Sequence, residues 1–142
     1  MTKARAHRRE GDADVGIAPP QRRYSPPPAE VCQFYTVPLR LPQPGNELRI
    51  TQKTYRDHLV DFTVTQSIRS EGQWITVAQV LQEDGAFWLR QYARASGSDV
   101  QEDLELQVIP ADGAWEVIGR TFDRAIEIMR DDWDENLRRW GR

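Results

Sequence analysis

Apolar and polar residues alternate along much of the chain, and this period of two predicts β-strands. Val60, Phe62, Val64 and Ile68 follow it in one stretch. Glu71-Gly72 and Asp84-Gly85 are turn signals between apolar runs, and Asp-Gly in particular favours a tight hairpin. We therefore expect strands over 60–68, 74–82 and 87–94, followed by a last strand over 104–108 that ends before Pro110.

A further strand is predicted nearer the N-terminus. Tyr35, Val37, Leu39 and Leu41 alternate with other residues. Pro38 has no backbone N–H to donate, which restricts this strand to the edge of a sheet. After a loop of prolines and Gly45, Leu48 and Ile50 suggest another short strand.

The C-terminal segment changes to helical periodicity. Its large apolar residues recur at intervals of three and four and fall on one stripe of a helix. Gly119 costs about 1 kcal/mol inside a helix, so Thr121 is an alternative N-cap. A helix from Thr121 to Trp140 is about 30 Å long, which matches strands of nine to eleven residues. The stripe consists of Trp115, Ile118, Phe122, Ile126, Met129, Trp133, Leu137 and Trp140.

These elements predict the fold class α+β, with an antiparallel β-meander packed against one long C-terminal amphipathic helix. If both turns have two residues, one face of the sheet is richer in bulky apolar groups, and we place the helix there. A turn longer by one residue would move the third strand to the opposite face. The predicted helix-facing residues are Val60, Phe62, Val64, Gln66, Ile68, Ile75, Val77, Gln79, Leu81, Trp88, Arg90, Tyr92 and Arg94.

Residues 1–33 differ in composition from the rest. Their only bulky apolar residues are Val15, Ile17, Tyr24 and Val31, too few to offset the entropy of ordering the backbone. We expect a disordered basic, proline-rich arm over 1–33 and a single α+β domain over 34–142. The prolines favour polyproline II geometry, which aromatic grooves recognise, although a plain linker has the same composition. The predicted partner-binding residues are Arg8, Arg9, Arg22, Arg23, Tyr24, Pro26, Pro27 and Pro28.

The N-terminal arm and the domain differ in net charge. Residues 1–33 hold six basic against four acidic residues, whereas residues 34–142 hold thirteen against eighteen. A net charge of −5 disfavours general binding of nucleic acid, because that affinity depends on Lys and Arg replacing counterions. The alternative nucleic-acid face is the strand with Trp88, Arg90, Tyr92 and Arg94, since alternating aromatics and arginines can stack bases and bind phosphates. The same residues also fit a core whose arginines extend to its rim.

Catalytic and metal signatures are few. His58 stands beside Asp57 and near Asp61, which allows acid–base chemistry, but a surface histidine is the commoner case. The chain's one cysteine and the one histidine of the domain are too few ligands for a zinc site, and no glycine-rich nucleotide motif occurs. We expect neither a cofactor nor a metal. A single cysteine, with no apolar run of membrane-spanning length and no secretory signal, leads us to expect a cytoplasmic protein.

The predicted order of elements over residues 58–140 is a strand, a strand that contains Gly-Gln-Trp-Ile-Thr-Val-Ala, an Asp-Gly turn, a further strand and a C-terminal helix. In this order of elements the segment resembles small uncharacterised bacterial meander-plus-helix domains. Such domains often carry Arg-Tyr-Asp followed by histidines around the second hairpin. Here Gln79, Val80 and Leu81 occupy the first positions, and Trp88 stands where a histidine is expected. The resemblance therefore implies a scaffold or binding derivative rather than an enzyme.

These observations favour a non-enzymatic interaction or assembly protein. Its N-terminal arm is expected to dock on a protein partner or on a neighbouring subunit of a larger particle, viral or cellular. The first alternative is a nucleic-acid-associated regulator or toxin-system component. The second is a small hydrolase built around His58, Asp57 and Asp61.

Overall fold

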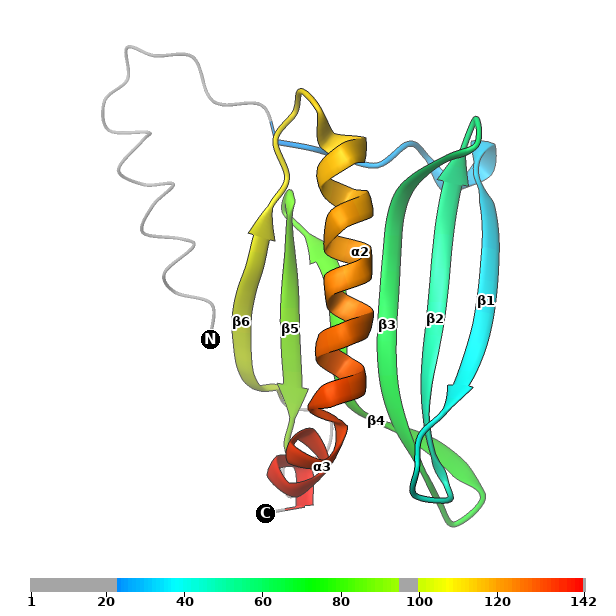
Figure 1. Ribbon diagram of the computed structural model, residues 1–142, viewed down its shortest axis with the longest axis vertical. Helices are drawn as coiled ribbons and strands as arrows, with labels where there is room; N and C mark the ends of the chain where they lie inside the picture. Colours follow the sequence, from blue (N-terminus) through cyan, green and yellow to red (C-terminus); the bar gives the residue numbers. More distant parts are fainter. Residues whose placement is uncertain (1–22, 95–99, 142) are drawn as a thin grey trace, which may run out of the picture.

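The computed structural model describes residues 23–94 and 100–141. One six-stranded antiparallel sheet has its strands in chain order, and two helices follow them (Figure 1). Helix α2 runs along one face of the sheet, and α3 turns across the end at which α2 finishes (Figure 1). The predicted α+β meander is confirmed. Its elements are η1 Ala29–Val31, β1 Gln33–Arg40, β2 Asn46–Tyr55, β3 His58–Ser70, β4 Gln73–Glu83, β5 Ala86–Tyr92, β6 Val100–Val108, α2 Ala114–Asp131 and α3 Trp133–Gly141.

Two-residue turns join β2 to β3, β3 to β4 and β4 to β5. Both residues of each turn have positive φ, namely Arg56-Asp57, Glu71-Gly72 and Asp84-Gly85. This conformation matches the twist of the strands it joins, and glycine or a short acidic residue adopts it at low cost. The second and third turns were predicted, whereas Arg56-Asp57 was not recognised.

A β-bulge in β4 changes which side chains face α2. Ser67 pairs with Thr76 and Gln66 pairs with Ala78, which leaves Val77 as an extra residue. An extra residue reverses the alternation of faces beyond it. The predicted face is therefore correct along β3 but wrong along the rest of β4 and along β5. On those strands the residues on the α2 side are Ala78, Val80, Phe87, Leu89 and Gln91.

The core lies between this face and α2. Phe62 of β3 stacks on Phe87 of β5 with ring centroids 4.3 Å apart, and Phe122 of α2 meets Phe62 edge-on at 5.1 Å. Replacing a buried phenylalanine such as Phe62 by alanine costs about 3–5 kcal/mol. The most buried residues of α2 are Ala114, Val117, Ile118, Thr121, Ala125 and Met129.

The single long helix is not observed, because the chain breaks at Asp132. Helix α2 begins at Ala114, after Gly113 in the left-handed conformation, so Thr121 lies inside the helix and is not its N-cap. The hydroxyl of Thr121 donates instead to the carbonyl of Val117. After the break, the carbonyl of Trp133 accepts a hydrogen bond from the Gln66 side chain. The break thus turns α3 onto the end of the sheet.

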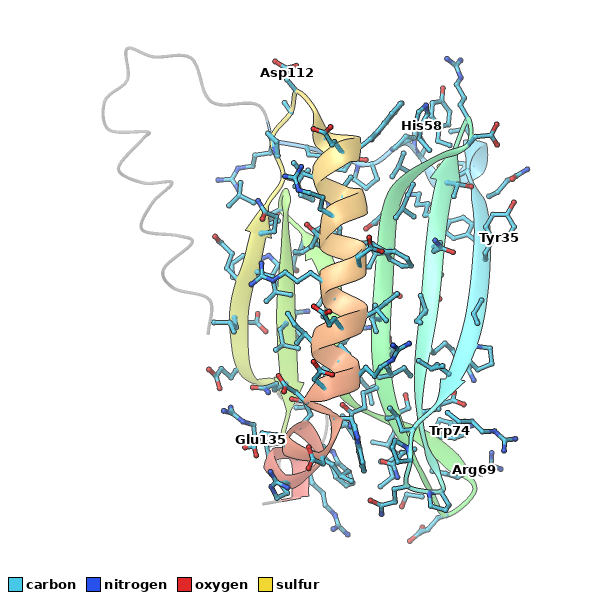
Figure 2. All side chains as sticks on the ribbon, in the orientation of Figure 1. Tyr35, His58, Arg69, Trp74, Asp112 and Glu135 are labelled. Atoms are coloured by element: carbon cyan, nitrogen blue, oxygen red, sulfur yellow. The ribbon has the colours of Figure 1, made fainter. Side chains whose placement is uncertain are left out.

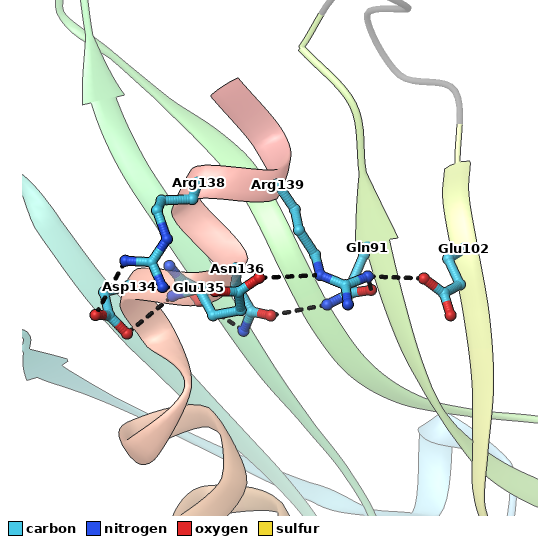
Figure 3. A network of polar contacts seen from close by, with 8 residues as sticks. Gln91, Glu102, Asp134, Glu135, Asn136, Arg138 and Arg139 are labelled. Atoms are coloured by element: carbon cyan, nitrogen blue, oxygen red, sulfur yellow. Dashed lines mark hydrogen bonds and ion pairs between the residues drawn. The ribbon is translucent and has the colours of Figure 1, made fainter. Parts of the chain in front are cut away.

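Buried amides hold α3 in this position (Figure 3). Asn136 donates to Gln66 at 3.1 Å and accepts from Gln91 at 2.9 Å. Arg139 then donates to Gln91 at 3.0 Å and to Glu102 of β6 at 2.8 Å. Because buried polar groups are costly unless they are paired, this network fixes one docking geometry for α3.

Candidate interaction surface on strand β1

The described part of the N-terminal arm packs on its own domain. Residues 23–32 cross the end of the molecule at which α2 begins and lead into β1 (Figure 1). The Tyr24 hydroxyl donates to the carbonyl of Val60 at 2.7 Å, and Arg23 donates to that of Asp84 at 3.0 Å. The described residues 23–33 therefore pack with the folded domain, whereas the predicted boundary lies at residue 34. Their apolar contribution was underestimated because a single ring, that of Tyr24, packs against the core.

Several predicted partner-binding residues thus contact other parts of the same chain. Tyr24, Pro26 and Pro27 are half-buried, whereas Arg23 and Pro28 are exposed. Pro27 also accepts a long hydrogen bond of 3.8 Å from the Cys32 thiol. The remaining predicted residues, Arg8, Arg9 and Arg22, lie outside the described residues.

Two groups, Tyr24 of the arm and Asp61 of β3, have raised pKa values. Burial raises the pKa of Tyr24 to about 12. Burial also raises the pKa of Asp61 to about 6, although the Phe62 backbone N–H and the charge of Lys53 oppose the shift. Partial removal from water thus disfavours the charged form of each side chain.

His58 stacks on Trp115 at the start of α2. Their ring centroids are 4.2 Å apart and their planes differ by 25°. Asp61 accepts a hydrogen bond from the backbone of Phe62. Within residues 23–94 and 100–141, no hydrogen bond joins His58 to Asp57 or Asp61, and no three metal-ligating side chains gather. The described geometry does not orient His58 as a general base.

On the strand of the alternative nucleic-acid face, acidic neighbours neutralise the charge of Arg90. Arg90 bonds Asp103 at 3.0 Å and Glu83 at 2.7 Å, and these partners raise its pKa. Trp88 is buried and donates to the carbonyl of Glu83, while Tyr92 is half-buried. Arg94 lies over the ring of Trp140 at 5.4 Å. The contacts of Arg90 leave it poorly suited to bind phosphates.

Strand β1 presents the largest group of exposed apolar side chains on one described element. Phe34, Tyr35 and Val37 are 53 %, 51 % and 53 % exposed, and Val31 just before the strand is exposed as well. Figure 2 shows Tyr35 at the outer edge of the sheet. Edge strands usually carry charged side chains that discourage pairing with other chains. Between Val31 and Leu39, β1 has none.

The opposite edge of the sheet differs in this respect. Strand β6 also exposes Leu104 and Val108, but it carries Glu102, Asp103 and Glu105. Asp103 and Glu102 form ion pairs with Arg90 and Arg139. In addition, Arg124 of α2 donates to the carbonyl of Leu106 at 3.3 Å. Of the two edges, β1 is therefore the one better suited to bind another chain.

The exposed side chains of β1 occupy both faces of the sheet. Val37 pairs with Ile50 of β2, which pairs with Val64 of β3. In the same way Tyr35 is aligned through Gln52 with Phe62. Because Val64 and Phe62 face α2, Val37 and Tyr35 also lie on the α2 side. We call Tyr35, Val37, Leu39 and Ile50 the β1 shelf. Phe34, Thr36 and Pro38 lie on the other face, where the hydroxyls of Thr36 and Thr51 are 3.2 Å apart.

The hairpin defines which backbone groups of β1 meet the open edge. Leu41 donates its N–H to the carbonyl of Asn46 within the β1–β2 hairpin. In an antiparallel pair alternate residues point toward the partner strand, so Phe34, Thr36, Pro38 and Arg40 direct their backbone groups outward. Pro38 lacks the N–H at this edge, as expected for an edge strand.

The sequence predicted β1 as an edge strand but assigned it no function. The available signal was that Phe34 and Tyr35 are adjacent, which places aromatic groups on both faces of a strand that Pro38 marks as an edge. Exposure itself could not be predicted, because it depends on whether α2 extends over β1.

Comparison with known proteins does not assign this chain to a family. No family model, curated protein or solved structure shows significant similarity to this chain. The resemblance to bacterial meander-plus-helix domains stays a prediction. Neither α2 nor α3, nor any other helix in the described ranges, has the length and apolar character needed to cross a bilayer.

Proposed function

We propose that the protein is a non-enzymatic assembly protein whose copies associate through β1. The observation that supports this most directly is the exposure of Phe34, Tyr35 and Val37 on an edge strand whose outer side no described strand pairs with. An added strand would pair with the outward backbone groups and cover these side chains at the same time, as in β-augmentation. The proposal keeps the interaction class expected from the sequence but places the surface on β1.

A second copy of the chain suits this surface better than a charged partner. The stretch between Val31 and Leu39 carries no charge, so two copies of it meet without like-charge repulsion. Apolar residues on both faces also find apolar counterparts on an identical strand. Two-fold pairing of one patch with itself is the commonest arrangement in homodimers.

The apolar free energy of this surface is of the same size as the cost of association. A buried aromatic side chain covers about 150–250 Å², so the exposed halves of Phe34 and Tyr35 in two copies amount to about 300–500 Å². At about 25 cal/mol per Å² this contributes about 8–12 kcal/mol. Association costs about 4–15 kcal/mol in lost freedom. The two terms are comparable, so the loss of one of these side chains should weaken the dimer strongly.

Light scattering on the full chain tests the proposal. Wild type should show a concentration-dependent mass approaching twice 16.5 kDa. Val37→Lys should remain at 16.5 kDa with unchanged circular dichroism, because it places a charge in the β1 shelf. The matched control is Leu104→Lys, which changes a 52 % exposed residue on the opposite edge and should behave as wild type. A wild type that stays monomeric at every concentration would overturn the proposal.

A further inference from the structure

We infer that the two-fold axis of the β1 dimer passes beside Tyr35, so that Phe34 of each copy pairs with Thr36 of the other. This inference rests on the proposed function and specifies its geometry. Antiparallel pairing about one residue places residues at equal distances on either side opposite each other. Phe34 and Thr36 both direct their N–H and C=O groups to the open edge, so this register forms a closed set of backbone hydrogen bonds around the axis.

Pro38 argues against the neighbouring register centred on Thr36. That register places Pro38 opposite Phe34 of the second copy, within the ladder, where its missing N–H and its ring disrupt pairing. The register centred on Tyr35 places Pro38 opposite Cys32 instead. At Cys32 the chain leaves the strand for η1, and its N–H already donates to the carbonyl of Ala29. Pro38 then lies outside the hydrogen-bonded part.

The side chains agree with this register on both faces. The two Tyr35 side chains are directly opposite each other on the α2 side, in a non-hydrogen-bonded pair with Cα atoms about 4.5 Å apart. The two Phe34 side chains are diagonal neighbours on the other face, within reach of aromatic contact. Each aromatic ring that is half-exposed in one copy thereby acquires an aromatic neighbour.

The charges at the two ends of β1 are complementary in the same register. Glu30 lies five residues before Tyr35 and Arg40 five residues after it, and both are exposed. Pairing about Tyr35 therefore places η1, which holds Glu30, beside the end of the second copy's β1 that holds Arg40, twice in the dimer. Exposed pairs of this kind are worth about 0.2–1 kcal/mol each and mainly select register.

Disulfide trapping tests the register. In a Cys32→Ser background, Tyr35→Cys should form a cross-linked dimer with oxidised glutathione, because its Cα spacing suits a disulfide. Thr36→Cys should not cross-link, since diagonal residues are about 7–8 Å apart. The rival register about Thr36 predicts the reverse. Cross-linking of Thr36→Cys alone would therefore overturn the inference and leave the proposed function intact.

Charge reversal gives a second readout that does not remove Tyr35. Glu30→Arg and Arg40→Glu should each weaken dimerisation about three- to tenfold, whereas the double variant should recover wild-type affinity. Glu116→Arg, on the exposed surface of α2, is the control for net charge and should leave affinity unchanged. If the double variant is no tighter than the single ones, Glu30 and Arg40 do not meet and the register is wrong. A monomeric wild type would reject the proposed function itself.

Discussion

The hydroxyl of Tyr24 donates a hydrogen bond of 2.7 Å to the carbonyl of Val60, 36 residues further along the chain. This bond ties the segment that precedes β1 to the third strand of the sheet. Strand β1 thus begins from an anchored segment rather than from a free arm, and its open edge is held beside β2 in a fixed orientation.

Tyr24→Phe should lower the free energy of unfolding by about 1 kcal/mol. The ring still packs against the core, but the carbonyl of Val60 loses its side-chain donor. Urea denaturation measures the difference. The control is Tyr35→Phe, whose hydroxyl bonds the exposed Gln33 side chain and should matter by less than about 0.5 kcal/mol. Equal losses in the two variants would show that the Tyr24 bond does not anchor the arm.

The raised pKa of Asp61 predicts a specific dependence of stability on pH. The folded state holds this proton with a pKa of about 6, against an ordinary value of 3.8. Between these values the folded state binds more protons than the unfolded state, so the contribution of Asp61 to stability falls as pH rises from about 4 to about 6. It then remains at its lower value above about pH 6.

Asp61→Asn should remove this fall. Relative to wild type, the variant should gain stability across the interval from about pH 4 to about pH 6, as measured by thermal unfolding in matched buffers. Asp57→Asn is the control, because Asp57 lies exposed in a turn at positive φ that asparagine also tolerates. A stability difference between Asp61→Asn and wild type that is the same at both ends of the interval would contradict the assignment.

Asn136→Leu should destabilise the protein by about 2–4 kcal/mol. The change removes one hydrogen bond from each of two buried amides, Gln66 and Gln91, and each polar atom left unsatisfied costs about 1–3 kcal/mol. Arg138→Gln, at an exposed ion pair on the same helix, should leave the free energy of unfolding nearly unchanged. Denaturant unfolding compares them. A loss at Asn136 no larger than at Arg138 would mean that the network does not hold α3.

Arg90→Gln tests the alternative assignment of that strand. The change leaves Asp103, whose side chain is 7 % exposed, without its partner, so we expect a loss of about 2–3 kcal/mol in stability. Binding of single-stranded DNA or RNA should be equally weak before and after the change, because Arg90 is already neutralised. A folded Arg90→Gln protein that loses a steep, salt-dependent affinity for nucleic acid would instead support the nucleic-acid function.

The sequence was informative where local chemistry decides structure. The Glu71-Gly72 and Asp84-Gly85 turns and the apolar stripe of the C-terminal segment follow from backbone preference and periodicity alone. The bulge at Val77 does not, because alternation continues through it and only the pairing with β3 shows the extra residue. As a result, Trp88 and Arg90 were placed on the wrong face.

The remaining differences depend on contacts between distant parts of the chain. The break at Asp132 is stabilised by Gln66 and Gln91, which lie far from it in sequence. Residues 23–32 pack on the domain because Tyr24 reaches β3. The exposure of Tyr35 and Val37 depends on how far the other described elements extend over β1 on the α2 side, where they leave both side chains about half exposed. No periodicity in the sequence contains this information.

Residue-resolved amide hydrogen exchange, measured over a range of protein concentrations, tests association through β1 most directly. The amides of Phe34 and Thr36 point to the open edge and should become more protected as concentration rises, while that of Val37, already bonded to β2, should change little. Leu104 and Val108 on the opposite edge should exchange at the same rate throughout. Exchange at Phe34 and Thr36 that is fast and independent of concentration would contradict assembly through this strand.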